Sequence, residues 1–206
     1  MSKPEPITQK KLLLAEGRDA ELFLVWAGRH FRPERDFQVM NFGGIKELTN
    51  FLKLLANDES YDDNVETIVV ARDAEMDAKA AIDSIQNSMK QADMPVPKKP
   101  FEYTQESSLK TAFMIFPGPE YQSGRLEDLC LLTVENDPLL ECVDDYLECA
   151  KAKGEQLPRI HKSKLHCFLA GKKDYAGLPI GLASCEKAWD IDHLALEPFK
   201  RIIQEM

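Results

Sequence analysis

The stretches LLLAEG (Leu12–Gly17) and TIVVARDAEMD (Thr67–Asp77) decide the predicted fold, because each places acidic residues directly after a short apolar run. A short apolar run bounded by turn-forming residues is typical of a buried strand in a parallel sheet. Carboxylates at the carboxyl ends of such strands lie at the sheet edge where open α/β folds bind ligands. The two stretches therefore predict an acidic site at one edge of a parallel sheet.

The segments around these stretches alternate between strand-like and helix-like patterns, in the order β-α-β-α-β-α. This order favours an α/β fold with a mainly parallel sheet flanked by helices. Asp19 is expected to cap the first helix, and Gly43 and Gly44 to open the second, with Ile45 facing inward. The predicted strands are Lys11–Ala15, Phe37–Met40, Thr67–Ala71 and Thr111–Phe116, and the predicted helices run from Asp19 to Arg29, from Gly43 through Leu55 and from Met76 to Ala92.

The pattern changes at Gly124, after which almost the whole chain has helical spacing. A length of 206 residues suits one large domain or one domain with a helical extension. We therefore expect an α/β core over residues 1–123 and a helical C-terminal portion over residues 124–206, packed together as one compact domain. The predicted helices of that portion are Leu126–Leu132, Pro138–Ala152, Ser163–Ala170, Leu178–Ala188 and Leu196–Gln204.

Composition and charge limit the possible functions. No apolar stretch is long enough to cross a bilayer, and the first residues lack the apolar core of a signal peptide, so a cytoplasmic protein without membrane contact is expected. The formal net charge of −9 argues against strong sequence-independent binding to nucleic acid, which needs a basic surface. It does not exclude a metal-dependent enzyme acting on phosphate, because the cation compensates its acidic ligands.

Several familiar site types are not found in the sequence. The five cysteines are odd in number and form no CxxC pair, which argues against a disulfide framework and a zinc knuckle. Most of them are expected to be small buried side chains. The four histidines are scattered without metal-ligand spacing. Phosphate-binding glycine loops and the GxSxG nucleophile elbow are also missing, so neither P-loop hydrolysis nor acyl transfer of that type is expected.

The acidic residues at the predicted strand ends form the candidate site. Glu16 closes the first strand, beside Gly17. Asp73 and Glu75 would lie on one side of a chain that stays extended, and Asp77 would follow in the first helical turn. Three or four carboxylates gathered in one place repel one another unless a hard divalent cation such as Mg²⁺ neutralises them. A metal site for phosphodiester chemistry is therefore the leading interpretation.

Each candidate except one also has an ordinary structural explanation. Glu16 alone would fit a surface turn, and acids such as Glu75 and Asp77 stabilise the amino terminus of a helix. Asp73 has no such explanation. Glu127, in GRLEDLCLL, lies near a predicted helix start, where helix capping is the simpler interpretation. Lys164 belongs to a basic cluster for which a solvated helix face is the default.

The order of these elements resembles the Toprim domain, the metal-binding module of topoisomerases, primases and overcoming-lysogenization-defect nucleases. That module has a glutamate at the end of its first strand and an Asp-x-Asp or Asp-x-Glu motif at the end of a later one, which Glu16 in AEG and Asp73-Ala74-Glu75 match here. From Leu12 to Glu205 the chain is similar to a family of small bacterial Toprim-like proteins of uncharacterised function. The similarity lies in AEGRDAELFL, VVARDAEMDA, GRLEDL and KSKLHCFLA…WDIDH.

The resemblance implies a cofactor and a set of site residues. The cofactor is Mg²⁺ or Mn²⁺, which would polarise a phosphate and activate a water, with Glu16 either as a ligand or as the general base. Lys164 is implied as a basic residue near the site. The implied metal ligands are Glu16, Asp73, Glu75 and Glu127, with Asp77 as a further candidate.

Three hypotheses follow for the function. The first is a Mg²⁺- or Mn²⁺-dependent nuclease that acts on DNA or RNA. The second is a non-catalytic module that binds a metal or a nucleotide phosphate weakly and docks a partner, such as an ATPase encoded elsewhere. The acidity of the chain favours the second, and so does Ala20, because nuclease relatives often carry an acid there for a second metal ion. The third makes Asp73 a phosphoacceptor, and it lacks the companion motifs of such folds.

Overall fold

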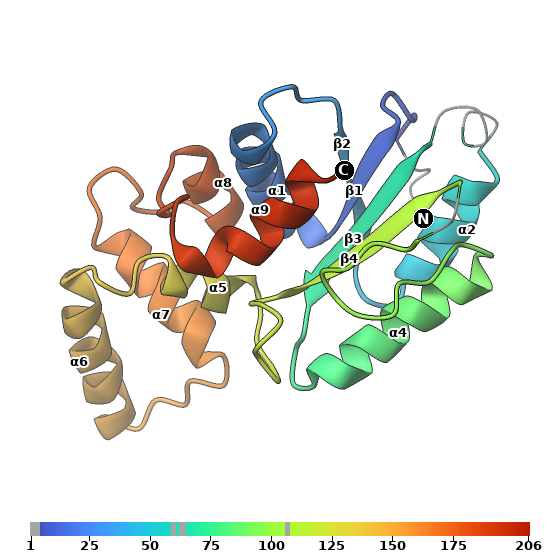
Figure 1. The fold of residues 1–206 in the computed structure, drawn as a ribbon. Helices are drawn as coiled ribbons and strands as arrows, with labels where there is room; N and C mark the ends of the chain where they lie inside the picture. The colour runs from blue at the N-terminus through green and yellow to red at the C-terminus, as the bar shows by residue number, and fades with distance from the viewer. Residues whose placement is uncertain (1–4, 59–60, 62–64, 106–107) are drawn as a thin grey trace.

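The computed structural model describes residues 5–58, 61, 65–105 and 108–206, and its centre is a four-stranded sheet (Figure 1). The strands are β1 (Lys11–Glu16), β2 (Gln38–Gly43), β3 (Thr67–Asp73) and β4 (Lys110–Phe116). Every pair is parallel and the order is β2-β1-β3-β4, which confirms the predicted parallel sheet. The central strands β1 and β3 are therefore neighbours, and their carboxyl ends lie at the same edge.

Helices cover both faces of this sheet, as predicted (Figure 1). Two helices, α2 (Leu48–Ala56) and α4 (Ala78–Gln91), pack against one face. The other face is covered by α1 (Gly17–Phe31) and by the C-terminal portion, which is helical. The C-terminal helices are α5 (Leu126–Leu132), α6 (Leu139–Ala152), α7 (Ile160–Ala170), α8 (Ile180–Cys185), the 3₁₀ helix η1 (Leu194–Leu196) and α9 (Glu197–Gln204).

The central strands are buried on both sides, because consecutive side chains of a strand point to opposite faces. Leu13 and Val69 belong to the hydrophobic cluster under α1 and the C-terminal helices, whereas Leu14 and Val70 belong to the cluster under α2 and α4. All four side chains are fully buried. Burial on both faces is the physical reason that the two strands appear in the sequence as unbroken apolar runs.

Aromatic packing joins the sheet to the last helix of the chain. The ring of Phe116, at the end of β4, stacks on Phe199 of α9 with centroids 5.3 Å apart. Phe23 of α1 meets the same ring edge to face at 6.0 Å. Such pairs add to the energy of simple burial. The hydrophobic cluster on this side therefore contains residues from both the core and the C-terminal portion.

Two local predictions are wrong. The first helix begins before Asp19, whose Oδ1 does not cap it but accepts a hydrogen bond of 2.9 Å from the backbone N–H of Gly181 in α8. The second prediction concerned the glycine pair after β2. The strand continues through Gly43 and α2 begins only at Leu48, so Ile45 lies in the connection and is 45% exposed. Asp19 and Gly181 are 162 residues apart, which is why the local pattern at Asp19 missed this contact.

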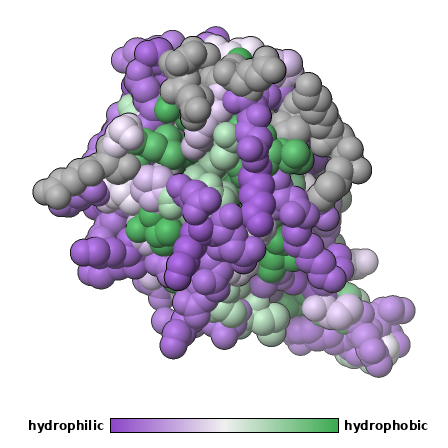
Figure 2. All heavy atoms as spheres, turned by 90° about the vertical axis from the view of Figure 1, so that its right-hand side faces the viewer, coloured by the Kyte–Doolittle hydropathy of each residue, from purple (hydrophilic) through white to green (hydrophobic). Residues whose placement is uncertain are grey.

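The surface carries more cysteine than expected. Cys130 is the one fully buried thiol, whereas Cys142, Cys149 and Cys185 are exposed. On the face seen in Figure 2, hydrophilic side chains dominate and hydrophobic ones appear only as small separate areas. Among the described residues, no helix combines the length and apolar character needed to span a bilayer.

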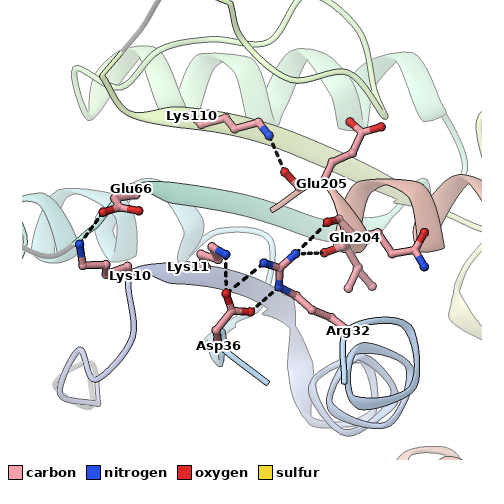
Figure 3. Close-up of polar contacts among 9 residues, drawn as sticks. Lys10, Lys11, Arg32, Asp36, Glu66, Lys110, Gln204 and Glu205 are labelled. Atoms are coloured by element: carbon pink, nitrogen blue, oxygen red, sulfur yellow. Dashed lines mark hydrogen bonds and ion pairs between the residues drawn. The ribbon is translucent and has the colours of Figure 1, made fainter. Parts of the chain in front are cut away.

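Ion pairs and hydrogen bonds hold the amino edge of the sheet to the C-terminal residues (Figure 3). Arg32, just after α1, donates to the carbonyl oxygen of Gln204 at 2.7 Å and also pairs with Asp36. Lys11 contacts the same Asp36 carboxylate at 2.5 Å, and the two cations lower the pKa of that carboxyl well below its usual range. Lys110 donates to the carbonyl oxygen of Glu205 at 2.5 Å. These contacts lie at the edge opposite to the acidic strand ends.

Candidate functional site

Three of the predicted acids line one small pocket at the carboxyl edge of the sheet. Glu16 ends β1, Asp73 ends β3, and Glu127 lies in the first turn of α5. Together with neighbouring residues they border a pocket of about 170 Å³. The pairing of β1 with β2 shifts register between Ala15 and Glu16, and such irregularities re-aim a side chain at a strand end. The structure thus brings together carboxylates that are far apart in sequence.

Asp73 is the most perturbed carboxyl of this group. Burial raises its pKa to about 7, and the neighbouring charges of Glu127, Glu16 and Glu75 act in the same direction. A hydrogen bond of 2.9 Å from the backbone N–H of Leu126 to Oδ1 opposes the shift. The rise in pKa reflects chiefly the cost of burying this charge, to which the nearby negative charges add. A cation bound there would remove that cost.

Glu16 faces a buried arginine that the sequence analysis did not select. The Nε of Arg72, whose side chain is 1% exposed, lies 3.4 Å from Glu16 Oε2. That distance is an ion-pair contact without hydrogen-bond geometry. Arg72 Nε and Nη1 and Glu16 Oε2 have no hydrogen-bond partner among the residues that the structure describes. Burial raises the pKa of Glu16, and the charge of Arg72 opposes the rise. Buried polar atoms without partners are rare in folded proteins, so each one needs a physical explanation.

Glu75 lies close to the pocket but lines the larger cleft beside it. Its φ of 57° ends the extended backbone that would have placed it beside Asp73. Its backbone exchanges hydrogen bonds of 2.9 and 2.8 Å with Gly124, and its carboxylate pairs with Arg125 at 2.5 Å. The predicted alternation therefore fails at this residue. Glu75 lines the larger cleft beside the pocket, and not the pocket itself.

Asp77 has the structural role that was its simpler interpretation, and Asp128 has a similar role at the start of α5. The side chain of Asp77 accepts a hydrogen bond of 3.1 Å from the backbone N–H of Ala80 and caps α4. Asp128 accepts one of 2.8 Å from the backbone N–H of Arg125 at the start of α5, and it also contacts His161. Neither side chain lines the small pocket.

A cleft of about 1210 Å³ adjoins the pocket, and Glu127 lines both. Residues of α5, α6 and α7 and the turn after β4 form its walls. Lys164 lies in this cleft and pairs with Asp144 at 2.7 Å, so the structure does not bring it to Glu16 and Asp73. Of these two lysines, Lys162 is nearer to the acids of the pocket, because its Nζ lies 4.0 Å from the Glu127 carboxylate.

The donor chemistry of the pocket fits a hard divalent cation. Glu16, Asp73 and Glu127 supply carboxylate oxygens, the ligands that Mg²⁺ and Mn²⁺ prefer. The partnerless Oε2 of Glu16 is an acceptor that an ion would satisfy. However, no group of three or more His, Cys, Asp or Glu side chains within the described part of the chain is already arranged to hold a metal ion. Metal binding here therefore requires side-chain rotation.

Sequence reasoning missed two arginines and one acid of this site. Arg72 directly follows the apolar run of β3, and a basic residue between that run and Asp73 is a signal that could have been used. Arg125 lies two residues before the first acid of GRLEDL, but nothing local indicates its pairing with Glu75. Asp19 lines the pocket through contact with α8, which only the tertiary structure reveals.

The chain belongs to the family described as protein of unknown function (DUF3226), whose model matches residues 10–206. No curated protein and no solved structure matches the chain. Family membership thus covers nearly the whole chain but assigns no activity. The resemblance to the Toprim domain stays a prediction, with which the observed sheet and helices are consistent.

Proposed function

We propose that this protein is a Toprim-like, metal-dependent phosphodiesterase that acts on nucleic acid. The observation that carries the proposal is the shared pocket of Glu16, Asp73 and Glu127 at the carboxyl edge of a parallel sheet. Ligand sites of open α/β folds lie at this edge. The acids come from three separate elements, which local helix capping or a surface turn does not explain together.

The pocket residues would hold one Mg²⁺ or Mn²⁺ ion through the carboxylates of Glu16, Asp73 and Glu127. Such an ion polarises a phosphate and lowers the pKa of a bound water. For Asp73 to bind a cation, its carboxylate must share Oδ1 with the N–H of Leu126 or use Oδ2. The raised pKa of Asp73 makes proton loss part of metal binding, so binding is expected to strengthen as the pH rises through 7.

The adjoining cleft is the proposed path for substrate. It opens from Glu127 between the sheet edge and the C-terminal helices, so a phosphodiester lying in it would reach the pocket from one side. Lys162 and Arg125 are cations on this path, although each is near an acidic partner. With a net charge of −9, the chain is expected to bind nucleic acid weakly and with a shallow dependence on salt.

The test is nicking of supercoiled plasmid DNA and cleavage of RNA by the full chain with and without Mn²⁺. The unaltered chain should cleave one of these substrates only with the metal, and Asp73→Ala should abolish cleavage while leaving the circular dichroism spectrum unchanged. Asp83→Ala, which removes an exposed carboxylate from α4, is the matched control and should keep full activity. Equal cleavage by Asp73→Ala and the unaltered chain contradicts the assignment.

A non-catalytic module is the second candidate, in which the same pocket binds metal weakly and the domain docks a partner such as an ATPase. The lack of a preformed ligand group among the described residues favours it, and so does Ala20 at the edge of the pocket. Titration calorimetry with Mn²⁺ beside the cleavage assays separates the two candidates. Metal binding without cleavage of DNA or RNA supports the module.

A further inference from the structure

Arg72 is a buried cation without a structural explanation. It directly precedes Asp73 on β3, and its side chain is 1% exposed. Its one ion-pair contact among the described residues is with Glu16 Oε2 at 3.4 Å, and both Nε and Nη1 lack hydrogen-bond partners. A buried guanidinium that is poorly satisfied is costly, and a hydrophobic residue would be the cheaper choice inside a strand. The charge of Arg72 is therefore more simply explained by its electrostatic effect on the neighbouring acids than by packing.

The charges around the small pocket match one divalent ion. Four carboxylates line it, and Arg72 and Lys162 offset two of their charges through contacts of 3.4 and 4.0 Å. Two neighbouring ion pairs leave this sum unchanged. Arg18, which also lines the pocket, pairs with Glu21 at 2.6 Å, and Arg125 pairs with Glu75 at 2.5 Å. Two negative charges remain, which one Mg²⁺ or Mn²⁺ neutralises, whereas two ions would leave an excess of positive charge in a partly buried place. The lining carboxylates are Glu16, Asp19, Asp73 and Glu127.

We propose that Arg72 restricts the site to a single divalent ion. Its positive charge lies beside Glu16, where a second cation would have to bind, and repels that cation. The inference rests on the proposed function and deepens it. Two-metal sites hold their ions about 3.5–4 Å apart and share carboxylates between them. Here the guanidinium is fixed against one of the acids that would be shared, and Ala20, which lines the same pocket, supplies no further ligand. Arg72 is thus a positioning residue that acts through Glu16.

The experiment is an equilibrium titration of the full, metal-stripped chain with Mn²⁺, followed by the electron paramagnetic resonance of free Mn²⁺. The unaltered chain should bind one ion. Arg72→Met should take up a second Mn²⁺ ion and bind the first at least ~10-fold more tightly, because a nearby positive charge is removed. Arg72→Lys should still bind one ion, within ~3-fold of the affinity of the unaltered chain. Arg18→Met is the matched control, because Arg18 also lines the pocket but is exposed and paired with Glu21 at 2.6 Å. It should change the affinity by less than ~3-fold.

The outcomes separate this inference from the function on which it rests. Two ions bound to the unaltered chain, seen as a stoichiometry of two and as coupling between Mn²⁺ ions, overturn the role of Arg72 and leave the phosphodiesterase in place. A folded Arg72→Met variant that still binds a single ion, or binds it no more tightly than the unaltered chain, also overturns it. If that variant does not fold, Arg72→Gln, which removes the same charge but keeps a polar side chain, takes its place with the same expected results. No Mn²⁺ binding at all to the unaltered chain overturns both proposals.

Discussion

Replacing Asp73 by asparagine should make the metal-free protein more stable at neutral and alkaline pH. The amide is nearly the same size as the carboxyl and can still accept the 2.9 Å hydrogen bond from Leu126. What the substitution removes is a charge that the pocket disfavours. Burial and the neighbouring acids raise the pKa of Asp73 from 3.8 to about 7, so its ionisation in the folded state costs free energy.

The size and the pH window of the effect follow from that pKa. A difference of one in pKa corresponds to about 1.4 kcal/mol, so full ionisation of Asp73 costs the folded state roughly 4 kcal/mol. Below pH 3.8 the carboxyl is protonated in both the folded and the unfolded chain, and the cost vanishes. As the pH rises from 3.8 to 7 the unfolded chain loses its proton first, so stability falls, and above 7 the loss is complete. Asp73→Asn should escape this fall.

The assay is urea unfolding of both chains in a metal chelator, from pH 4 to pH 8.5. The free energy of unfolding should be higher for Asp73→Asn by roughly 4 kcal/mol at pH 8 and should converge near pH 4. Adding Mn²⁺ at pH 8 should stabilise the unaltered chain and not the variant. Asp83→Asn, on the exposed side of α4, is the control and should show no such pH-dependent difference. A variant that is no more stable than the unaltered chain at pH 8 refutes the electrostatic reasoning.

Two further substitutions test the packing around the site. Asp77→Ala removes the cap of α4 and should lower the free energy of unfolding by about 1 kcal/mol. The affinity for Mn²⁺ should not change, so urea unfolding and Mn²⁺ titration of the same variant distinguish a helix cap from a metal ligand. Gly181→Ala places a Cβ 2.8 Å from Leu22 Cβ, where α8 meets α1, and should cost about 1–3 kcal/mol in urea unfolding. Gly44→Ala meets nothing within 4 Å and should be close to neutral, so equal losses at both glycines would contradict the packing argument.

The sequence predicted the order of strands and helices because the strands are buried on both faces. Leu12–Ala15 and Thr67–Ala71 stand out as apolar runs for that reason, and α5 has the predicted bounds of Leu126–Leu132. The meeting of Glu16 with Asp73 could also be predicted, because parallel neighbours end at the same edge.

The remaining features of the site depend on contacts that no local pattern encodes. Glu75 adopts a left-handed backbone that is uncommon for glutamate, and its bridge to Gly124 spans a large gap in sequence. Asp19 finds its partner at Gly181, across most of the chain. Lys164 turns to Asp144, whereas the neighbouring Lys162 lies nearer to Glu127. In each case a contact with a distant element determines where the residue lies and which group it pairs with.

The stacking of Phe116 on Phe199 has a consequence for dissecting this protein by deletion. A shortened chain that stops at residue 123 would keep every strand of the sheet, yet it would lose α9 and leave the Phe116 ring and its neighbours in contact with water. Such a fragment should aggregate, so cleavage and metal affinity should be measured on the whole chain and not on the fragment. Point substitutions in the intact chain are therefore the sound way to dissect the pocket.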